Sequence, residues 1–227
     1  RLPLLAPMSD VAGQLAIQIG THLLHQPQGG SGILLGGLPG AERGRVTVIG
    51  AGIAGGSAVR VAAALGAEVV VFDRKRDRLE AMRGLGNNVT ALYAYPDSVE
   101  SAVVESDLVV GAVLIPGARA PHVVTAEQVS RMRAGSVIVD ISVDQGGCIE
   151  TTRPTDYRSP TYRVDDVVHL AVTNLPGAVP RSASQALSAA ITPYVLQLAS
   201  GDWSQNAGLQ QGVNIRAGTL AHPALTG

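Results

Sequence analysis

A glycine-rich turn between two apolar segments is the feature that most constrains the fold of this 227-residue chain. Gly50-Ala-Gly-Ile-Ala-Gly55 matches G-x-G-x-x-G, directly after Val46-Thr-Val-Ile49 and before a helical pattern at 57–65. In such a strand–turn–helix the first glycine makes a tight turn, the second lets the backbone approach a diphosphate, and the third allows close helix–strand packing. The segment predicts a dinucleotide-binding turn. The alternative is a glycine-rich turn without a ligand.

Short apolar runs alternate with helical patterns beyond residue 45. Continuous apolar runs are typical of strands that are buried on both faces, and strand–helix alternation implies right-handed crossovers in a parallel sheet. The sequence therefore predicts an α/β fold with a Rossmann-type doubly wound parallel sheet. We expect strands at 46–49, 68–72, 91–93, 108–114, 136–141 and 167–172, and helices at 57–65, at 99–106, at 126–133 and in a charged stretch that ends near residue 82.

Helical patterns also flank this region on both sides. Apolar residues recur every four positions from Val11 to Leu23, behind the N-cap candidate Ser9-Asp10, which predicts a helix over 9–25. A long helix is expected over 182–198, followed by a Gly- and Asn-rich tail. We therefore expect an N-terminal linker helix in 1–30, a nucleotide-binding domain in 31–180 and C-terminal helices in 181–227.

Composition excludes several classes of protein. The chain is 46% hydrophobic and 15% charged with a formal net charge of −1, which argues against disorder and against nucleic acid as a partner. No segment reaches the length of an uncharged membrane span, so we expect a soluble protein without a membrane partner. The single Cys148 excludes an internal disulfide and suits the cytoplasm. Because Arg1 stands where an initiator Met would, we expect a chain that starts inside a longer protein or was processed.

An acidic residue ends the strand after the glycine-rich turn. Asp73 follows Gly50 by 23 residues, close to the interval of about 20 at which a carboxylate accepts hydrogen bonds from the adenosine ribose. A carboxylate at this place repels a 2′-phosphate, so the sequence favours NAD over NADP. The basic run Arg74-Lys-Arg76 and Arg78 could cover a phosphate or an adenine, or could form a solvated helix start.

Two further strand ends carry candidate residues, since ligands of open α/β sheets collect at the carboxyl ends of strands. They are Gly111–Leu114 and Ile141–Asp144, and Asp144 is followed by Gln-Gly-Gly. For Asp144, loop capping and chemistry remain equally open. The five histidines are scattered without a metal-ligand pattern, so no metal is expected, and Cys148 is expected to be an inert thiol.

Several segments together resemble the alanine dehydrogenase/transhydrogenase family over almost the entire chain. A transhydrogenase subunit typically reads Glu-Gln-Gly-Gly-Asn where this chain reads Asp144-Gln-Gly-Gly-Cys148, so the alanine dehydrogenase branch is favoured. The segments that carry the resemblance are Ala6–Gly13, Gly36–Gly40, Gly50–Gly55, Gly111–Gly117, Val139–Cys148 and Asn174–Pro180.

The resemblance implies NAD as the cofactor and oxidative deamination of L-alanine to pyruvate and ammonium, with hydride transfer to NAD. Asp144 corresponds to the acid beside the reacting centre, which implies a catalytic role in proton transfer. The cofactor-binding residues implied by the turn and by the resemblance are Ser9, Gly50, Gly52, Ile53, Ala54, Gly55, Asp73, Arg78, Val113, Leu114, Ile141, Ser142, Val143, Arg153, Val172, Asn174 and Leu175.

Intact family members also carry an N-terminal substrate domain, which supplies an Arg, a Lys and a His to the substrate and against which the C-terminal helices pack. No position of this chain matches those residues, so we expect the chain alone to be inactive. The resemblance further implies a homo-oligomer, namely a hexamer. Two alternatives remain: a catalytically silent NAD(H)-binding module, and a transhydrogenase alpha-type subunit.

Overall fold

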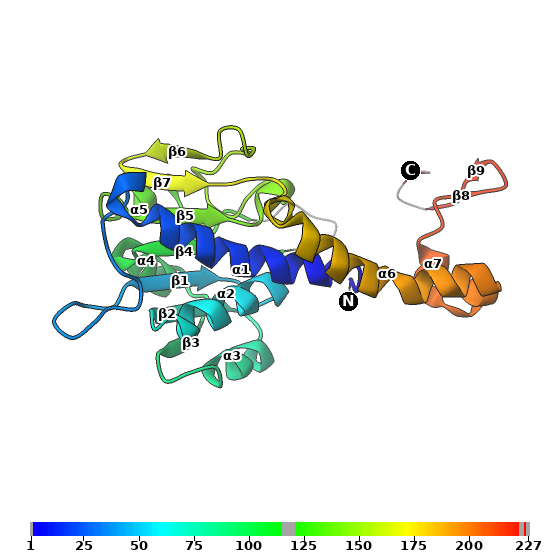
Figure 1. Ribbon diagram of the computed structural model, residues 1–227, viewed down its shortest axis with the longest axis horizontal. Helices are drawn as coiled ribbons and strands as arrows, with labels where there is room; N and C mark the ends of the chain where they lie inside the picture. The colour runs from blue at the N-terminus through cyan, green and yellow to red at the C-terminus, as the bar shows by residue number, and fades with distance from the viewer. Residues whose placement is uncertain (1, 115–120, 223–224, 226–227) are drawn as a thin grey trace. The chain divides into compact units, whose positions relative to one another are not determined.

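The computed structural model describes residues 2–114, 121–222 and 225, and within them a mixed, mostly parallel sheet forms the centre of the larger compact unit, 8–179 (Figure 1). The sheet has seven strands in the order β3-β2-β1-β4-β5-β7-β6 among the described residues. Their bounds are β1 Arg45–Ile49, β2 Glu68–Asp73, β3 Val89–Tyr93, β4 Leu108–Gly111, β5 Val137–Asp140, β6 Thr161–Val164 and β7 Val167–Leu170.

Apolar runs explain why the central strands lie where they do. Every residue of β4, β5 and β7 is buried, as is β1 after its first residue. The register places Val48 of β1 between Val71 of β2 and Val110 of β4, so β-branched side chains pack side by side through the middle of the sheet. The predicted doubly wound α/β fold is therefore confirmed.

Helices cover both faces of the sheet, and each face has its own apolar core. One core includes Ile17 of α1 and Val59 of α2, with Met82 of α3 packed against it. The other includes Val103 of α4 and Val129 of α5. The bounds of these helices are α1 Ala6–Leu23, α2 Ile53–Ala64, α3 Arg76–Arg83, α4 Pro96–Glu105 and α5 Ala126–Ser130.

The strand order reverses between β1 and β4, which is where the chain first crosses from one half of the sheet to the other. In open α/β sheets, ligands bind beside the carboxyl ends of the strands at such a reversal. The carboxyl end of β1 leads directly into the glycine-rich turn, and the carboxyl end of β4 leads into residues 112–114. The fold thus brings several predicted site segments to one edge.

Three local expectations are corrected. The helix predicted over 9–25 begins at Ala6. Pro7 suits the first turn, because proline has no N–H group and the first N–H groups of a helix are unpaired in any case. Ser9 therefore lies inside α1 and is not its N-cap. A strand absent from the prediction, β6, pairs antiparallel with β7 at the edge of the sheet. The tail predicted to lack pattern contains α7 Ala207–Gln211 and a short hairpin, β8 Ile215–Arg216 with β9 Thr219–Leu220.

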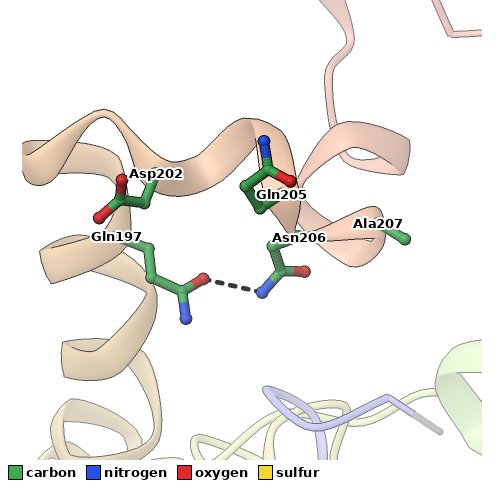
Figure 2. A pocket seen from close by; sticks show the side chains of 5 residues that line it. All are labelled: Gln197, Asp202, Gln205, Asn206 and Ala207. Atoms are coloured by element: carbon green, nitrogen blue, oxygen red, sulfur yellow. Dashed lines mark hydrogen bonds between the residues drawn. The ribbon is translucent and has the colours of Figure 1, made fainter.

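The second compact unit comprises 1–7 and 180–227. Its main element is α6 Pro180–Ser200, which has no buried residue and exposes Val195, Leu196 and Leu198. A hollow of about 550 Å³ lies between the end of α6 and α7, lined by Gln197, Asp202, Gln205, Asn206 and Ala207 (Figure 2). Within the described part of the chain, no helix is long and apolar enough to cross a membrane.

Candidate functional site

The glycine-rich turn adopts a geometry that only glycine allows at two of its positions. Gly50 has φ +101°, and a Cβ there would lie 2.5 Å from the carbonyl oxygen of Ala112. A Cβ on Gly55 would lie 1.7 Å from the carbonyl oxygen of Gly50. Larger side chains would therefore separate β1, α2 and β4, so these two glycines set the close approach of helix and strands.

Gly52 is different, because protein atoms leave room above it. Among the described residues, a Cβ there would meet only Nη1 of Arg78, at 3.9 Å. Gly52 is the N-cap of α2, and no side chain of the described residues caps that helix end. The first N–H groups of α2 thus lack intrahelical partners and carry the positive end of the helix dipole. This end of α2 fits an anionic group such as a diphosphate.

Asp73, at the end of β2, lies beside the turn. Its Oδ2 accepts hydrogen bonds from the Ala51 N–H at 2.8 Å and from Nη1 of Arg78 at 3.2 Å. Its Oδ1 accepts from the N–H groups of Arg74 and Lys75. Burial raises the pKa of Asp73, but these donors outweigh burial and hold that pKa below its usual value. The carboxylate is therefore ionised and held against the turn.

The basic run after Asp73 divides into two groups. The Arg78 guanidinium faces the site, where it contacts Asp73 and lies closest to Gly52. Arg76 instead pairs with the exposed Glu80 one helical turn away, at 2.8 Å. Arg78 is therefore placed to meet an anion at the turn, whereas Arg76 belongs to the solvated face of α3.

Asp144 lies on a short 3₁₀ turn, Val143–Gln145, that follows β5. Ser142 and Val143 are buried, which fixes the turn to the domain, while the side chain of Asp144 reaches the surface. Partial burial nevertheless raises the pKa of Asp144. A carboxyl group with a raised pKa at an exposed strand end is suited to exchanging a proton with a ligand.

Two further predicted sites lie beyond Asp144 in the chain. Arg153 follows the turn after β5, and the segment Val172–Leu175 follows β7, the strand that pairs with β5. The Arg153 N–H donates to the hydroxyl of Tyr162 at 2.8 Å, and its guanidinium lies 4.2 Å from the centre of that ring. Val172 and Leu175 are buried, whereas Asn174 is exposed at the start of a 3₁₀ turn. Asn174 and the neighbouring Thr173 are thus the residues of this segment that are open to a ligand.

The remaining predicted residues lie on neighbouring elements. Val113 and Leu114 follow β4, and Leu114 is 45% exposed. Ser9 lies in α1, whose Asp10 accepts a hydrogen bond from the Ser57 hydroxyl of α2. The described contacts therefore bring α1 against α2 through Asp10 rather than through Ser9. The motif predicted to end at Gly117 continues into 115–117, which lie outside the described residues.

Three side chains of this region were not singled out from the sequence. Asp140 is buried at the end of β5, and His169 of β7 is buried with Tyr162 stacked on it at 5.1 Å. His169 accepts or donates at Thr151 Oγ1, and burial lowers its pKa. A carboxylate at the end of an otherwise apolar run was the available signal for Asp140. Tyr162 and His169 have no such signal, because their contact depends on the antiparallel pairing of β6 and β7.

The described residues show neither an ionised thiol nor a cluster of metal ligands. Burial raises the pKa of the Cys148 thiol strongly, and the nearby Asp140 carboxylate raises it further. A protonated, buried thiol agrees with the expected inert role. The described residues contain no group of three or more His, Cys, Asp or Glu side chains that could hold a metal ion.

Comparison with known proteins finds relatives that match this chain over nearly its whole length. The chain is 49% identical to an alanine dehydrogenase of Halomonas elongata, over 99% of this chain and 62% of that protein. It is 46% identical to the alanine dehydrogenase of Bacillus subtilis, over 99% of this chain and 61% of that protein. The chain therefore spans less than two thirds of the length of these curated relatives.

Solved structures extend the similarity to three dimensions. A structure of an L-alanine dehydrogenase matches with a TM-score of 0.95 and 48% identity, covering 99% of this chain and 63% of that one. A transhydrogenase from Sinorhizobium meliloti matches with a TM-score of 0.81 and 25% identity, covering 97% of this chain and 61% of that one. The family model described as alanine dehydrogenase/PNT, C-terminal domain, matches residues 16–223. With its glycine-rich turn, its acid at the end of β2 and this match, the chain belongs to the alanine dehydrogenase/PNT C-terminal domain family.

Proposed function

We propose that this chain is the NAD-binding portion of an NAD-dependent L-alanine dehydrogenase, which converts L-alanine, NAD and water into pyruvate, ammonium and NADH with release of a proton. The observation that carries the proposal is the hydrogen bond from the Ala51 N–H to Asp73, which places a carboxylate beside the glycine-rich turn at the start of α2. The similarity of 46–49% to named alanine dehydrogenases supports the choice of substrate.

The turn would hold the dinucleotide through main-chain N–H groups of the protein. The N–H groups at the start of α2, from Ile53 and Ala54, would bind the diphosphate, with Arg78 as a counter-charge. Asp73 would accept hydrogen bonds from the adenosine ribose hydroxyls. In the structure all four contacts of Asp73 come from N–H groups, so a ribose hydroxyl would replace a contact such as that of Arg78. Binding would thereby free Arg78 to reach the diphosphate.

The nicotinamide end would lie along the carboxyl ends of β4, β5 and β7. Exposed Leu114 and Asn174 and the segment Ile141–Val143 would orient the ring, with Arg153, Val172 and Leu175 supporting it. Bound NAD would accept the hydride from Cα of L-alanine. Asp144 would exchange protons with the amino group and with the water that replaces it, a role for which its raised pKa suits it.

Substrate recognition needs groups beyond those assigned here. A substrate carboxylate calls for positively charged side chains that hold it in place. The relatives have a further portion that this chain does not match, and we propose that the corresponding part of the full-length protein supplies these side chains and a further acid/base. We propose the division 1–30 linker helix, 31–180 NAD-binding domain and 181–227 C-terminal helices. The exposed apolar residues Val195, Leu196 and Leu198 of α6 are suited to packing against such a domain.

We also propose a cytoplasmic homohexamer. A single cysteine that is buried and reduced agrees with a reducing compartment. Light scattering coupled to size-exclusion chromatography of the protein at its full natural length would give the mass of the oligomer directly. A monomer of the full-length protein would contradict the hexamer.

The second candidate, a transhydrogenase alpha-type subunit, is supported by the similarity in fold to the Sinorhizobium meliloti protein. The lower identity of 25% against 48% for the L-alanine dehydrogenase structure favours the dehydrogenase. One assay separates the alanine dehydrogenase from the transhydrogenase subunit and from a silent NAD(H)-binding module. The full-length protein is incubated with L-alanine and NAD at alkaline pH while absorbance follows NADH, and NADH formation that requires L-alanine supports the proposal. NADH binding without such turnover would favour the silent module or the transhydrogenase subunit over the dehydrogenase.

A further inference from the structure

The carboxyl group of Asp140, the last residue of β5, lies inside the turn that carries Asp144. Asp140 is fully buried. Its Oδ1 accepts a hydrogen bond from the Ser142 N–H at 2.9 Å, and its Oδ2 accepts one from the Cys148 N–H at 3.0 Å. Ser142 and Cys148 stand at the two ends of the turn. One side chain therefore binds both ends, with one oxygen for each.

Further donors and two glycines surround this carboxyl group closely. The Thr152 hydroxyl lies 2.7 Å from Oδ2, and the Cys148 thiol lies 3.7 Å from Oδ1. A Cβ on Gly111 would lie 3.0 Å from Oδ1, and a Cβ on Gly147 would lie 2.9 Å from Oδ2. Both oxygens are thus surrounded by donors, and glycines provide the space that the carboxyl group fills.

Asp144 depends on this turn for its position. Within the described part of the chain, no hydrogen bond holds the Asp144 carboxyl group, so the backbone alone decides where it lies. The N–H groups of Gln145 and Gly147 both donate to the Ser142 carbonyl oxygen, at 2.9 and 3.1 Å. Gly146 and Gly147 have φ of 93° and 74°, which closes the turn back onto Asp140.

We propose that Asp140 is a positioning residue for catalysis: by binding the N–H groups of Ser142 and Cys148, it holds Asp144 where that carboxyl group can exchange protons with the substrate. The inference rests on the proposed function. A displacement of about 1 Å in a reacting group can lower turnover about 100-fold. A turn released at one end would allow a displacement of that size.

Asp140→Asn tests the proposal because an amide cannot replace the carboxylate here. An amide has one acceptor oxygen and one NH₂ group, whereas the two backbone N–H groups need one acceptor each. In either orientation of the amide, the N–H of Ser142 or that of Cys148 faces an NH₂ group. The substitution therefore releases one end of the turn while leaving the volume of the side chain almost unchanged.

Asp107→Asn is the matched control. Asp107 is also buried, and its Oδ2 accepts the Arg45 N–H at 2.8 Å at the opposite, amino end of the sheet. It thus undergoes the same chemical change in a buried carboxyl group, but has no contact with the turn that carries Asp144. A loss of kcat shared by both variants would come from the loss of a buried carboxylate in general. A loss confined to Asp140→Asn would come from the released turn.

The experiment uses the protein at its full natural length, below the melting temperature of both variants. We expect Asp140→Asn to lower kcat for L-alanine oxidation at least about tenfold, while KM for NAD and the Kd of NADH change less than about threefold. Asp107→Asn should keep kcat within about twofold of the wild type. Amide hydrogen exchange in 142–148 should accelerate in Asp140→Asn only.

Thr152→Val provides a second test in case Asp140→Asn does not fold. It removes the hydroxyl that donates to Oδ2, so the Asp140 carboxyl group is fixed less firmly and binds the Cys148 N–H less well. We therefore expect a smaller loss in kcat, of about threefold, and faster exchange in 142–148. A wild-type kcat and unchanged exchange in Asp140→Asn, or in Thr152→Val where only that variant folds, would overturn the inference, as would an equal loss of kcat in Asp107→Asn. A full-length wild-type protein that forms no NADH with L-alanine would instead contradict the proposed function, so the two failures are distinguishable.

Discussion

The Ala51 N–H donates a hydrogen bond to Oδ2 of Asp73 at 2.8 Å, which ties the glycine-rich turn after β1 to the end of β2. Residues 22 positions apart thereby form one surface. The turn offers N–H groups to a diphosphate, and the carboxylate offers acceptors to a ribose. The shape of the turn and the preference for one dinucleotide are therefore coupled through a single contact.

The first prediction concerns the choice between NADH and NADPH. Because Asp73 is ionised beside the expected ribose, a 2′-phosphate would meet a like charge, so NADH should bind at least about tenfold more tightly than NADPH. Asp73→Asn should weaken NADH binding and reduce this preference. Fluorescence titration with both dinucleotides measures it, with Asp77→Asn on the neighbouring helix α3 as a control that changes an exposed charge. Equal affinities of the wild-type protein for NADH and NADPH would contradict the assignment.

The second prediction concerns stability at acid pH. The pKa of Asp73 is lowered in the folded protein, so its contribution to stability is present above the unfolded pKa of about 3.9 and is lost as the pH falls through the folded value. The difference in free energy of unfolding between wild type and Asp73→Asn should be constant from about pH 5 to 7 and shrink below about pH 4. Urea unfolding at several pH values measures this difference. A difference that grows on acidification would contradict a lowered pKa of Asp73 in the folded protein.

The third prediction concerns Asp144. Asp144→Asn in the full-length protein should lower kcat at least about 100-fold, because the amide cannot take up or release the proton, while the Kd of NADH changes less than about threefold. Steady-state kinetics and NADH titration give the two values. Gln145→Glu, added to Asp144→Asn, places a carboxyl group one position away and tests whether any acid on this turn suffices. Near-normal turnover of Asp144→Asn would assign Asp144 to loop capping.

Much of the fold could be predicted because its strands are buried on both faces. β1, β4 and β5 appear in the sequence as short, mostly apolar runs, and helical patterns between them indicate the crossovers. β6 escaped prediction because it lies at the edge, where Thr161-Tyr-Arg-Val has no fully buried residue to mark it. Local pattern therefore succeeds in the core of the sheet and fails at its margin.

The candidate site divides in the same way. The arrangement of Gly50, Gly52 and Asp73 around one turn could be predicted because their spacing along the chain reflects that turn and the strand beside it. The role of Asp140 could not, because it depends on a chain reversal through Gly146 and Gly147 that brings Cys148 back to β5. The start of α1 was misplaced because Ser9 looks like a cap, while Pro7 allows the helix to begin a turn earlier.

NADH titration of the 227-residue chain tests the proposed dinucleotide site most directly, since the turn, Asp73 and Asp144 all lie within the unit 8–179. We expect saturable binding of one NADH per chain, followed by nicotinamide fluorescence. Gly52→Val should weaken it at least about tenfold, because the valine side chain would fill the space over the α2 N-terminus, which Arg78 borders. Gly40→Ala, in an exposed loop whose added Cβ would meet no atom within 4 Å, is the control for a glycine substitution, although its φ of 94° carries some strain of its own. No saturable NADH binding, or binding that Gly52→Val leaves unchanged, would contradict the site.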